Sequence, residues 1–99
     1  MAIDYEFLNQ LMKAVRVKSK TAEEEIEDLI RACKKDLEIS GVYVTDDTDP
    51  LYRQATKLYC KANYGYDKDT EKFGSAYAAL RDSMALSGDY RKPGDSDGR

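Results

Sequence analysis

Cys33 and Cys60 carry the most nucleophilic side chains in this 99-residue sequence. A cysteine nucleophile needs a neighbouring base, usually histidine, to take up its proton. The sequence contains no histidine, which also removes the usual general base at neutral pH and any Cys/His zinc site. Because both cysteines fall within apolar helical patterns, we predict two buried, unreactive thiols and no enzymatic activity.

The acidic run Asp46-Asp47-Thr48-Asp49 could supply oxygen ligands to a cation. An EF-hand loop that begins at Asp47 would need glycine at its sixth position and glutamate at its twelfth, but Tyr52 and Leu58 stand there. A loop that begins at Asp46 fails in the same way. The glycines are scattered at predicted helix ends and form no phosphate-binding loop. We therefore expect neither a metal site nor a bound cofactor.

Arg53, Lys57 and Lys61 follow one another at intervals of four residues, in a segment (51–66) without acidic residues. Residues at this spacing share one face of an α-helix, and like charges there repel by a few tenths of a kcal/mol per pair. The cationic face is either a solvated surface or a binding surface. In the second case its partner is phosphate or the acidic surface of another subunit.

The predicted helix over residues 22–39 carries the opposite charge, with seven acidic and three basic residues. We assign Glu24, Glu27 and Asp28 to its interacting face. Surfaces of opposite sign on two sides of one protomer favour head-to-tail contacts, which can close into a ring. We therefore expect these three acids of one copy to face the three cations of the next copy.

Eight tyrosines and no tryptophan make a biased aromatic composition. Tyr59 and Tyr77 lie within apolar stripes, so we expect them at the rim of the core, with the ring buried and the hydroxyl wet. Tyr43, Tyr52 and Tyr90 lie outside the main stripes. We predict that these three contribute to an interface, where tyrosine is enriched.

The apolar spacing predicts an all-α fold, a small four-helix domain with the order helix–helix–loop–helix–helix. The first helix is expected over residues 5–16, after a cap at Asp4. The second runs from a Thr21–Glu24 capping box to Gly41. The third runs from Asp49-Pro50 to Gly65, and the fourth from near Asp67 or Asp69 to Ser87-Gly88. The predicted buried side of the third helix is Leu51, Ala55, Leu58, Tyr59 and Ala62. Gly74 suggests close packing of the fourth helix, and Val42-Tyr43-Val44 is too short to build a sheet.

The chain is expected to form one domain over residues 1–90, followed by a flexible polar tail (91–99) without apolar residues. The formal charge of −3 argues against a protein that grips DNA over its whole surface. We find no secretion signal and no apolar run long enough to span a bilayer. We therefore expect a soluble, intracellular protein.

Several short segments, taken in this order of helices, resemble the head–tail connector proteins of tailed bacteriophages over about residues 3–90. The segments are Glu38-Ile39-Ser40-Gly41, Asp49-Pro50, Tyr59-x-x-x-Asn63-Tyr64-Gly65-Tyr66 and Ala85-Leu86-Ser87-Gly88-Asp89-Tyr90. These proteins are also called head-completion, adaptor or DNA-packaging proteins. The resemblance therefore implies a structural protein of the virion.

The resemblance also implies partners and a location. Such proteins assemble as a ring beneath the portal of the filled head, extend the DNA channel and dock the stopper or tail. The implied partners are further copies in a ring that matches the portal's twelvefold symmetry, the portal protein, a stopper or tail-completion protein, and packaged DNA in transient, non-specific contact. The protein would be in the host cytoplasm during assembly and then at the head–tail junction.

Two other interpretations of the sequence remain open. The first is a small helical DNA-binding regulator, in which the cations of the third helix would contact phosphates. The acidic total charge argues against it, as do tyrosine, alanine and lysine where a recognition helix more often carries Asn, Gln or several Arg. The second is a helical dimerisation module without a further role.

Overall fold

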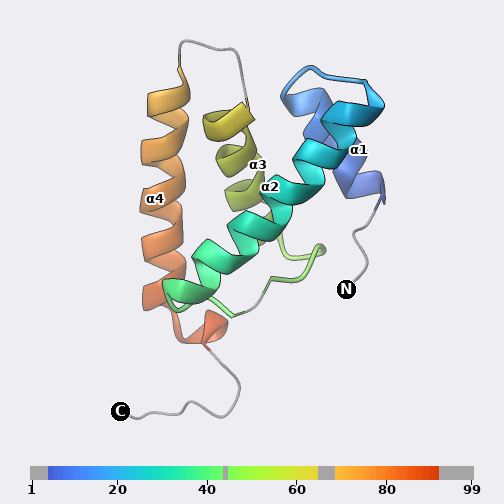
Figure 1. Cartoon of the computed structure of the whole chain (residues 1–99). Coiled ribbons are helices and arrows are strands. Elements are labelled where there is room, and N and C mark those ends of the chain that lie inside the picture. The colour runs from blue at the N-terminus through green and yellow to red at the C-terminus, as the bar shows by residue number, and fades with distance from the viewer. Residues whose placement is uncertain (1–4, 44, 65–68, 92–99) are drawn as a thin grey trace.

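The structure is a computed structural model of the chain, and it describes residues 5–43, 45–64 and 69–91. Its elements are α1 (Tyr5–Ala14), α2 (Lys20–Ile39), α3 (Pro50–Tyr64), α4 (Thr70–Leu86) and the 3-10 helix η1 (Gly88–Tyr90) (Figure 1). The described residues contain four α-helices and no strand, which confirms the predicted all-α, four-helix fold. The predictions for Asp4, Val44, Gly65, Asp67 and most of the tail (92–99) fall outside the described residues.

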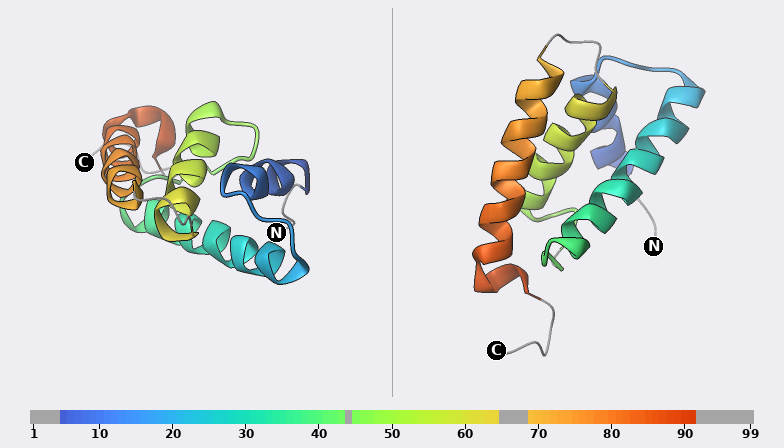
Figure 2. Two further views of the ribbon diagram at one scale, coloured as in Figure 1. Left: turned by 90° about the horizontal axis from the view of Figure 1, so that it is seen from above. Right: turned by 60° about the vertical axis from the view of Figure 1, so that its left-hand side comes forward.

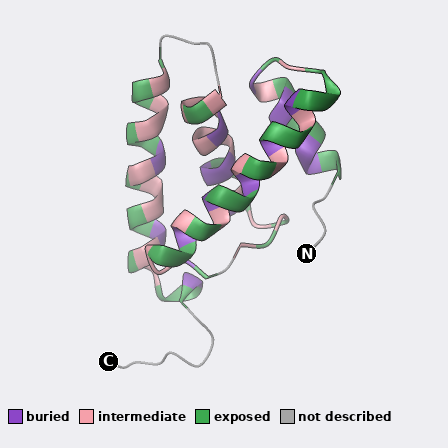
Figure 3. Ribbon diagram, in the orientation of Figure 1, coloured by how far each residue is buried: buried purple, intermediate pink, exposed green. Residues whose placement is uncertain are grey.

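α3 lies between α1 and α4, and α2 runs obliquely across one side of α3, from α1 towards the C-terminal end of α4 (Figure 2). All four helices turn their buried residues to a common core, and η1 closes the core at one end (Figure 3). The apolar stripe of α2 follows the predicted spacing. Its buried residues are Ala22, Ile26, Ile30, Cys33 and Leu37.

The N-terminus of α2 differs from the prediction. Ser19 is the N-cap, and its hydroxyl oxygen accepts a hydrogen bond from the backbone N–H of Ala22 at 3.0 Å. Thr21 therefore lies inside the first turn, so the predicted Thr21–Glu24 capping box is wrong. Serine and threonine both cap helices well, and capping at Ser19 adds two residues, Lys20 and Thr21, to the start of the helix. α1 is shorter than predicted, because it ends at Ala14.

α1 and α2 end in the same hydrogen-bonded motif. After α2, Gly41 has φ 102°, its N–H donates to Glu38 O, and the Val42 N–H donates to Leu37 O at 2.8 Å. This is the Schellman arrangement, and it confirms the role predicted for Gly41. After α1, the corresponding position is occupied by Arg16, which has φ 63°. An arginine in this left-handed conformation costs energy that glycine avoids.

α3 begins as predicted and buries a different face. Asp49 caps it by accepting the backbone N–H of Tyr52 at 2.9 Å. The buried residues are Tyr52, Ala55, Thr56 and Cys60, so only Ala55 of the predicted set is fully buried. Leu51 is 43% exposed, and Leu58, Tyr59 and Ala62 are half-buried. The buried side shifts towards Tyr52 and Thr56 because α2 covers that side of α3. Hydrogen bonding lets Thr56 be buried there, since its hydroxyl donates to Tyr52 O.

Candidate interaction surfaces

Arg53, the first of the three cations on α3, is held within the protomer. Its guanidinium lies 4.7 Å from the centroid of the Phe7 ring on α1. It donates hydrogen bonds to Gln10 Oε1 on α1 and, at 3.0 Å, to Asp47 O in the loop before α3. The sequence pattern did not reveal this role. Arg53 ties three segments together, so its side chain contributes to the tertiary structure.

Lys57 and Lys61 differ in their surroundings. The Lys61 amino group lies 5.0 Å from the centroid of the Phe73 ring on α4. Lys57 makes no hydrogen bond or ion pair among the residues that the structure describes, and it lines an open hollow of about 370 Å³ between α1 and α3. Phe7, Gln10, Pro50 and Arg53 are among the other lining residues. Of the three predicted cations, Lys57 is the one most available to a partner.

The three acids of α2 do not neutralise these cations within the protomer. Within residues 5–43, 45–64 and 69–91, Glu24 and Glu27 form no ion pair. Asp28 pairs with Arg31 of its own helix at 3.2 Å. Glu24 and Asp28 are exposed on the side of α2 that faces away from the core. The charges therefore remain sorted by helix, as the predicted head-to-tail contact requires.

Tyr52 is not at the surface, and its predicted place at an interface is wrong. Its side chain is fully buried, with the ring 6.2 Å from that of Phe7. The Lys34 amino group lies 5.9 Å from the ring centroid. Tyr52 is buried because α1 and α2 both pack against the first turns of α3. Burial raises the pKa of the Tyr52 hydroxyl.

Tyr90 is also buried within the protomer, with 8% of its surface exposed. Its hydroxyl donates to the Asp49 carboxylate, and its carbonyl oxygen accepts the Tyr43 N–H at 2.7 Å. Its place in the protomer is therefore at the junction of η1, α3 and the loop after α2. Of the three tyrosines assigned to an interface, only Tyr43 is substantially exposed, at 39%.

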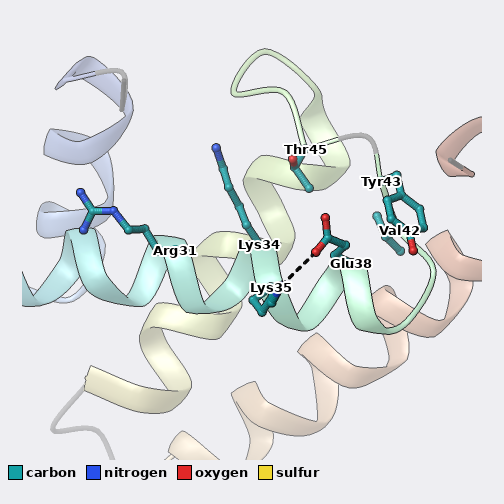
Figure 4. Close-up of a pocket in the computed structure, with 7 residues that line it drawn as sticks. All are labelled: Arg31, Lys34, Lys35, Glu38, Val42, Tyr43 and Thr45. Atoms are coloured by element: carbon teal, nitrogen blue, oxygen red, sulfur yellow. Dashed lines mark hydrogen bonds and ion pairs between the residues drawn. The ribbon is translucent and has the colours of Figure 1, made fainter. Parts of the chain in front are cut away.

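Tyr43 lies at one end of a second hollow, of about 300 Å³, between the C-terminal half of α2 and the loop that follows it. Figure 4 shows its lining residues, which are Arg31, Lys34, Lys35, Glu38, Val42, Tyr43 and Thr45. Three of the seven are cationic. The one acid, Glu38, pairs with Lys35 at 3.4 Å. The net positive charge suits an acidic side chain or an acidic protein segment.

The thiols are buried, as predicted. Burial raises the pKa of Cys33 to about 11 and that of Cys60 to about 12. Cys33 lies beside Tyr77, whose hydroxyl donates to Asp36 at 2.6 Å. Asp36 also pairs with Arg81 at 3.1 Å, so this polar cluster joins α2 to α4. The described residues contain no group of three or more His, Cys, Asp or Glu side chains that could hold a metal ion. They also contain no helix both long and apolar enough to cross a bilayer.

Comparison with known proteins assigns the chain to a family. A family model described as phage connector protein matches residues 7–91, which include α2, α3, α4, η1 and all but the first two residues of α1. No curated protein and no solved structure gives a significant match.

Proposed function

Since the chain belongs to the phage connector protein family, we propose that it is a head–tail connector, which assembles as a ring under the portal of the filled head and docks the stopper or tail. The observation that carries this proposal is the family match over nearly the whole domain. The sorted charges of α2 and α3 support it independently. They give one protomer two complementary surfaces for neighbouring copies in a ring.

The ring contact that we propose joins the exposed acids of α2 in one copy to Lys57 of the next. Lys57 is central to it because Arg53 is bound to α1 and Lys61 lies over Phe73. Lys61 can still contribute charge at the edge of the contact. Glu24, Glu27 and Asp28 supply the opposite surface. Contacts of this kind are screened by salt, so ring formation depends on ionic strength unless the portal serves as a template.

The other partners in this proposal are the portal, the stopper or tail-completion protein, and packaged DNA. DNA contact would be non-specific and weak, because the protein is acidic overall and its contacts would be to phosphate. The hollow beside Tyr43 offers a further surface for an acidic segment of a partner protein.

A DNA-binding regulator has less support. In that alternative α3 would enter a groove of duplex DNA and use its cations on phosphates. However, α3 is flanked by α1 and α4 and crossed by α2, and two of its cations already lie against aromatic rings of the same protomer. A gel-shift assay on duplex DNA at two salt concentrations separates the two functions.

Deletion of the gene from its phage tests the proposed function. We expect heads that fill with DNA and remain without tails, or that lose their DNA, in electron micrographs of the lysate. Supply of the protein from a plasmid should restore tailed, infectious particles. Tailed, infectious particles formed without the protein would contradict the proposal.

A further inference from the structure

The outward side of α2 carries a continuous stripe of exposed residues. Glu24, Asp28, Arg31, Lys35 and Ile39 follow at spacings of four, three, four and four, which place them on one helical face. This face lies opposite the buried residues of α2. All five residues are exposed, and Ile39, the last residue of the helix, is 77% exposed. Because α2 lies on the outside of the bundle, no other described helix covers the stripe (Figures 1 and 3).

The charges along this stripe change sign at the middle of the helix. Glu24 and Asp28 lie in the first half of α2, and Arg31 and Lys35 lie in the second half. Glu24 is as far before the midpoint of α2 (Lys20–Ile39) as Lys35 is after it. The same relation holds for Asp28 and Arg31. The stripe is therefore complementary to a second copy of itself that runs in the opposite direction.

The ion pairs now present within α2 do not prevent such a contact. Asp28 and Arg31 are 3.2 Å apart, with side chains 81% and 62% exposed, and Lys35 and Glu38 are 3.4 Å apart. Exposed pairs of this kind contribute little to stability, so their members can exchange partners. Ala32 is also exposed on this side of α2, and its small side chain allows two helices to approach closely.

We propose that α2 binds α2 of a second copy in an antiparallel, two-fold symmetric dimer. Glu24 of each copy faces Lys35 of the other, and Asp28 faces Arg31. In this antiparallel arrangement the positive end of each helix dipole lies beside the negative end of the other, which also favours the dimer. The contact is small and mostly charged, so the dimer is weak, dissociates on dilution and is sensitive to salt.

The dimer has a consequence for assembly, and this consequence rests on the proposed function. Glu24 and Asp28 serve both the dimer and the proposed contact with Lys57 of a neighbouring copy in a ring. One copy cannot make both contacts at once. The dimer therefore keeps the free protein from assembling into rings away from the portal.

Sedimentation of the full chain at low ionic strength tests the dimer with three variants. E24K/D28K makes the stripe wholly basic and R31E/K35E makes it wholly acidic, so each alone should raise the dimer Kd by at least about tenfold. Mixed together, these two variants should associate. The fourfold variant E24K/D28K/R31E/K35E should associate nearly as well as the wild type. K18E/K72E, which changes two exposed lysines outside α2 and shifts the net charge as much as R31E/K35E does, is the control and should dimerise normally.

A disulfide test fixes the direction of the helices. Position 24 should lie opposite position 35 of the other copy, so E24C and K35C should cross-link when mixed and not when each is alone. A monomeric wild type at millimolar concentration, no association between the two oppositely charged variants, or a monomeric fourfold variant would overturn the dimer. If self-association used only the contact between α2 and Lys57, R31E/K35E would still self-associate and the fourfold variant would associate more weakly than the wild type. The phage deletion experiment is independent of all these outcomes.

Discussion

The hydroxyl of Tyr90 donates to the carboxylate of Asp49, with Oη 2.9 Å from Oδ2 and 3.1 Å from Oδ1. The same Oδ2 accepts the backbone N–H of Tyr52 and so caps α3. The Asp49 carboxylate thus caps α3 and also anchors η1, the last helical element of the described chain. Asp49-Pro50 and Ser87-Gly88-Asp89-Tyr90 were both among the segments that resemble phage connectors. Two segments about 40 residues apart in the sequence therefore meet in the fold.

Removal of the Tyr90 hydroxyl should weaken this junction. We expect Y90F to lower the free energy of unfolding by about 1–2 kcal/mol, because a partly buried hydrogen bond to a carboxylate is lost while the ring is kept. Urea denaturation followed by circular dichroism measures the change. Y5F is the matched control, since Tyr5 is 67% exposed and its substitution should leave stability unchanged. Equal stability of Y90F and the wild type would show that the hydrogen bond contributes nothing.

Arg53 and Lys57, one turn apart on α3, should respond differently to alanine. R53A removes the contacts to Phe7, Gln10 and Asp47 and should lower the free energy of unfolding by about 1–2 kcal/mol. K57A should change it by less than about 0.5 kcal/mol. Thermal or urea unfolding of both variants provides the comparison. The assignment of Arg53 to the tertiary structure would be wrong if the two substitutions had the same effect.

Charge reversal of Lys57 should affect assembly and not folding. We expect K57E to reduce the number of copies that bind a purified portal and to make binding less sensitive to salt, because an attraction becomes a repulsion. Native mass spectrometry of the portal complex counts the copies. K72E, at an exposed position on α4, is the control. Unchanged occupancy for K57E would remove Lys57 from the contact.

The two left-handed helix ends should respond in opposite ways to substitution. G41A forces a Cβ onto a residue at φ 102° and should destabilise the protein by about 1–2 kcal/mol. R16G relieves φ 63° and should stabilise it by about 0.5–1 kcal/mol. Urea denaturation curves measure both changes. A stabilising G41A would contradict the Schellman motif at the end of α2.

The two buried thiols should make the free energy of unfolding fall at alkaline pH. Their pKa rises from 9.0 to about 11 for Cys33 and about 12 for Cys60. The unfolded chain therefore loses these protons at lower pH than the folded chain. Stability is complete below pH 9 and is lost as the pH rises from 9.0 towards 11 and 12. Between about pH 7.5 and about pH 9.5 we expect a loss of roughly 1–2 kcal/mol, and a clearly smaller loss in C33A/C60A. An equal loss in both proteins would assign the effect to other groups.

The sequence predicted the parts of the fold that depend on local signals. The spacing of apolar residues in α2, the cap at Asp49 and the glycine at position 41 are short-range patterns, and each is found in the structure. Ser19 and Thr21 are both favoured N-cap residues and lie two residues apart, so the choice between them depends on how α2 meets the core. Local patterns could not make that choice.

The candidate interface was predicted less well, because exposure is a tertiary property. Tyr52 and Tyr90 fall outside the apolar stripes and are nevertheless buried, because α1 and α2 pack around Tyr52 and because the Tyr90 hydroxyl donates to Asp49. Arg53 has the spacing of a surface cation, but Phe7 and Gln10, which hold it, are distant in sequence. If the sequence had shown that α2 packs against α3, the predicted buried face of α3 would have included Tyr52. Only the tertiary structure identifies that neighbour.

A cryo-electron microscopy reconstruction of the head–tail junction, from virions or from the isolated portal complex, tests the central claim most directly. We predict a ring of this protein against the portal, in which the exposed acids of α2 in each copy lie within ion-pair distance of Lys57 in the next copy. A junction that lacks the protein would contradict the connector role. A ring in which Lys57 faces solvent would contradict the contact.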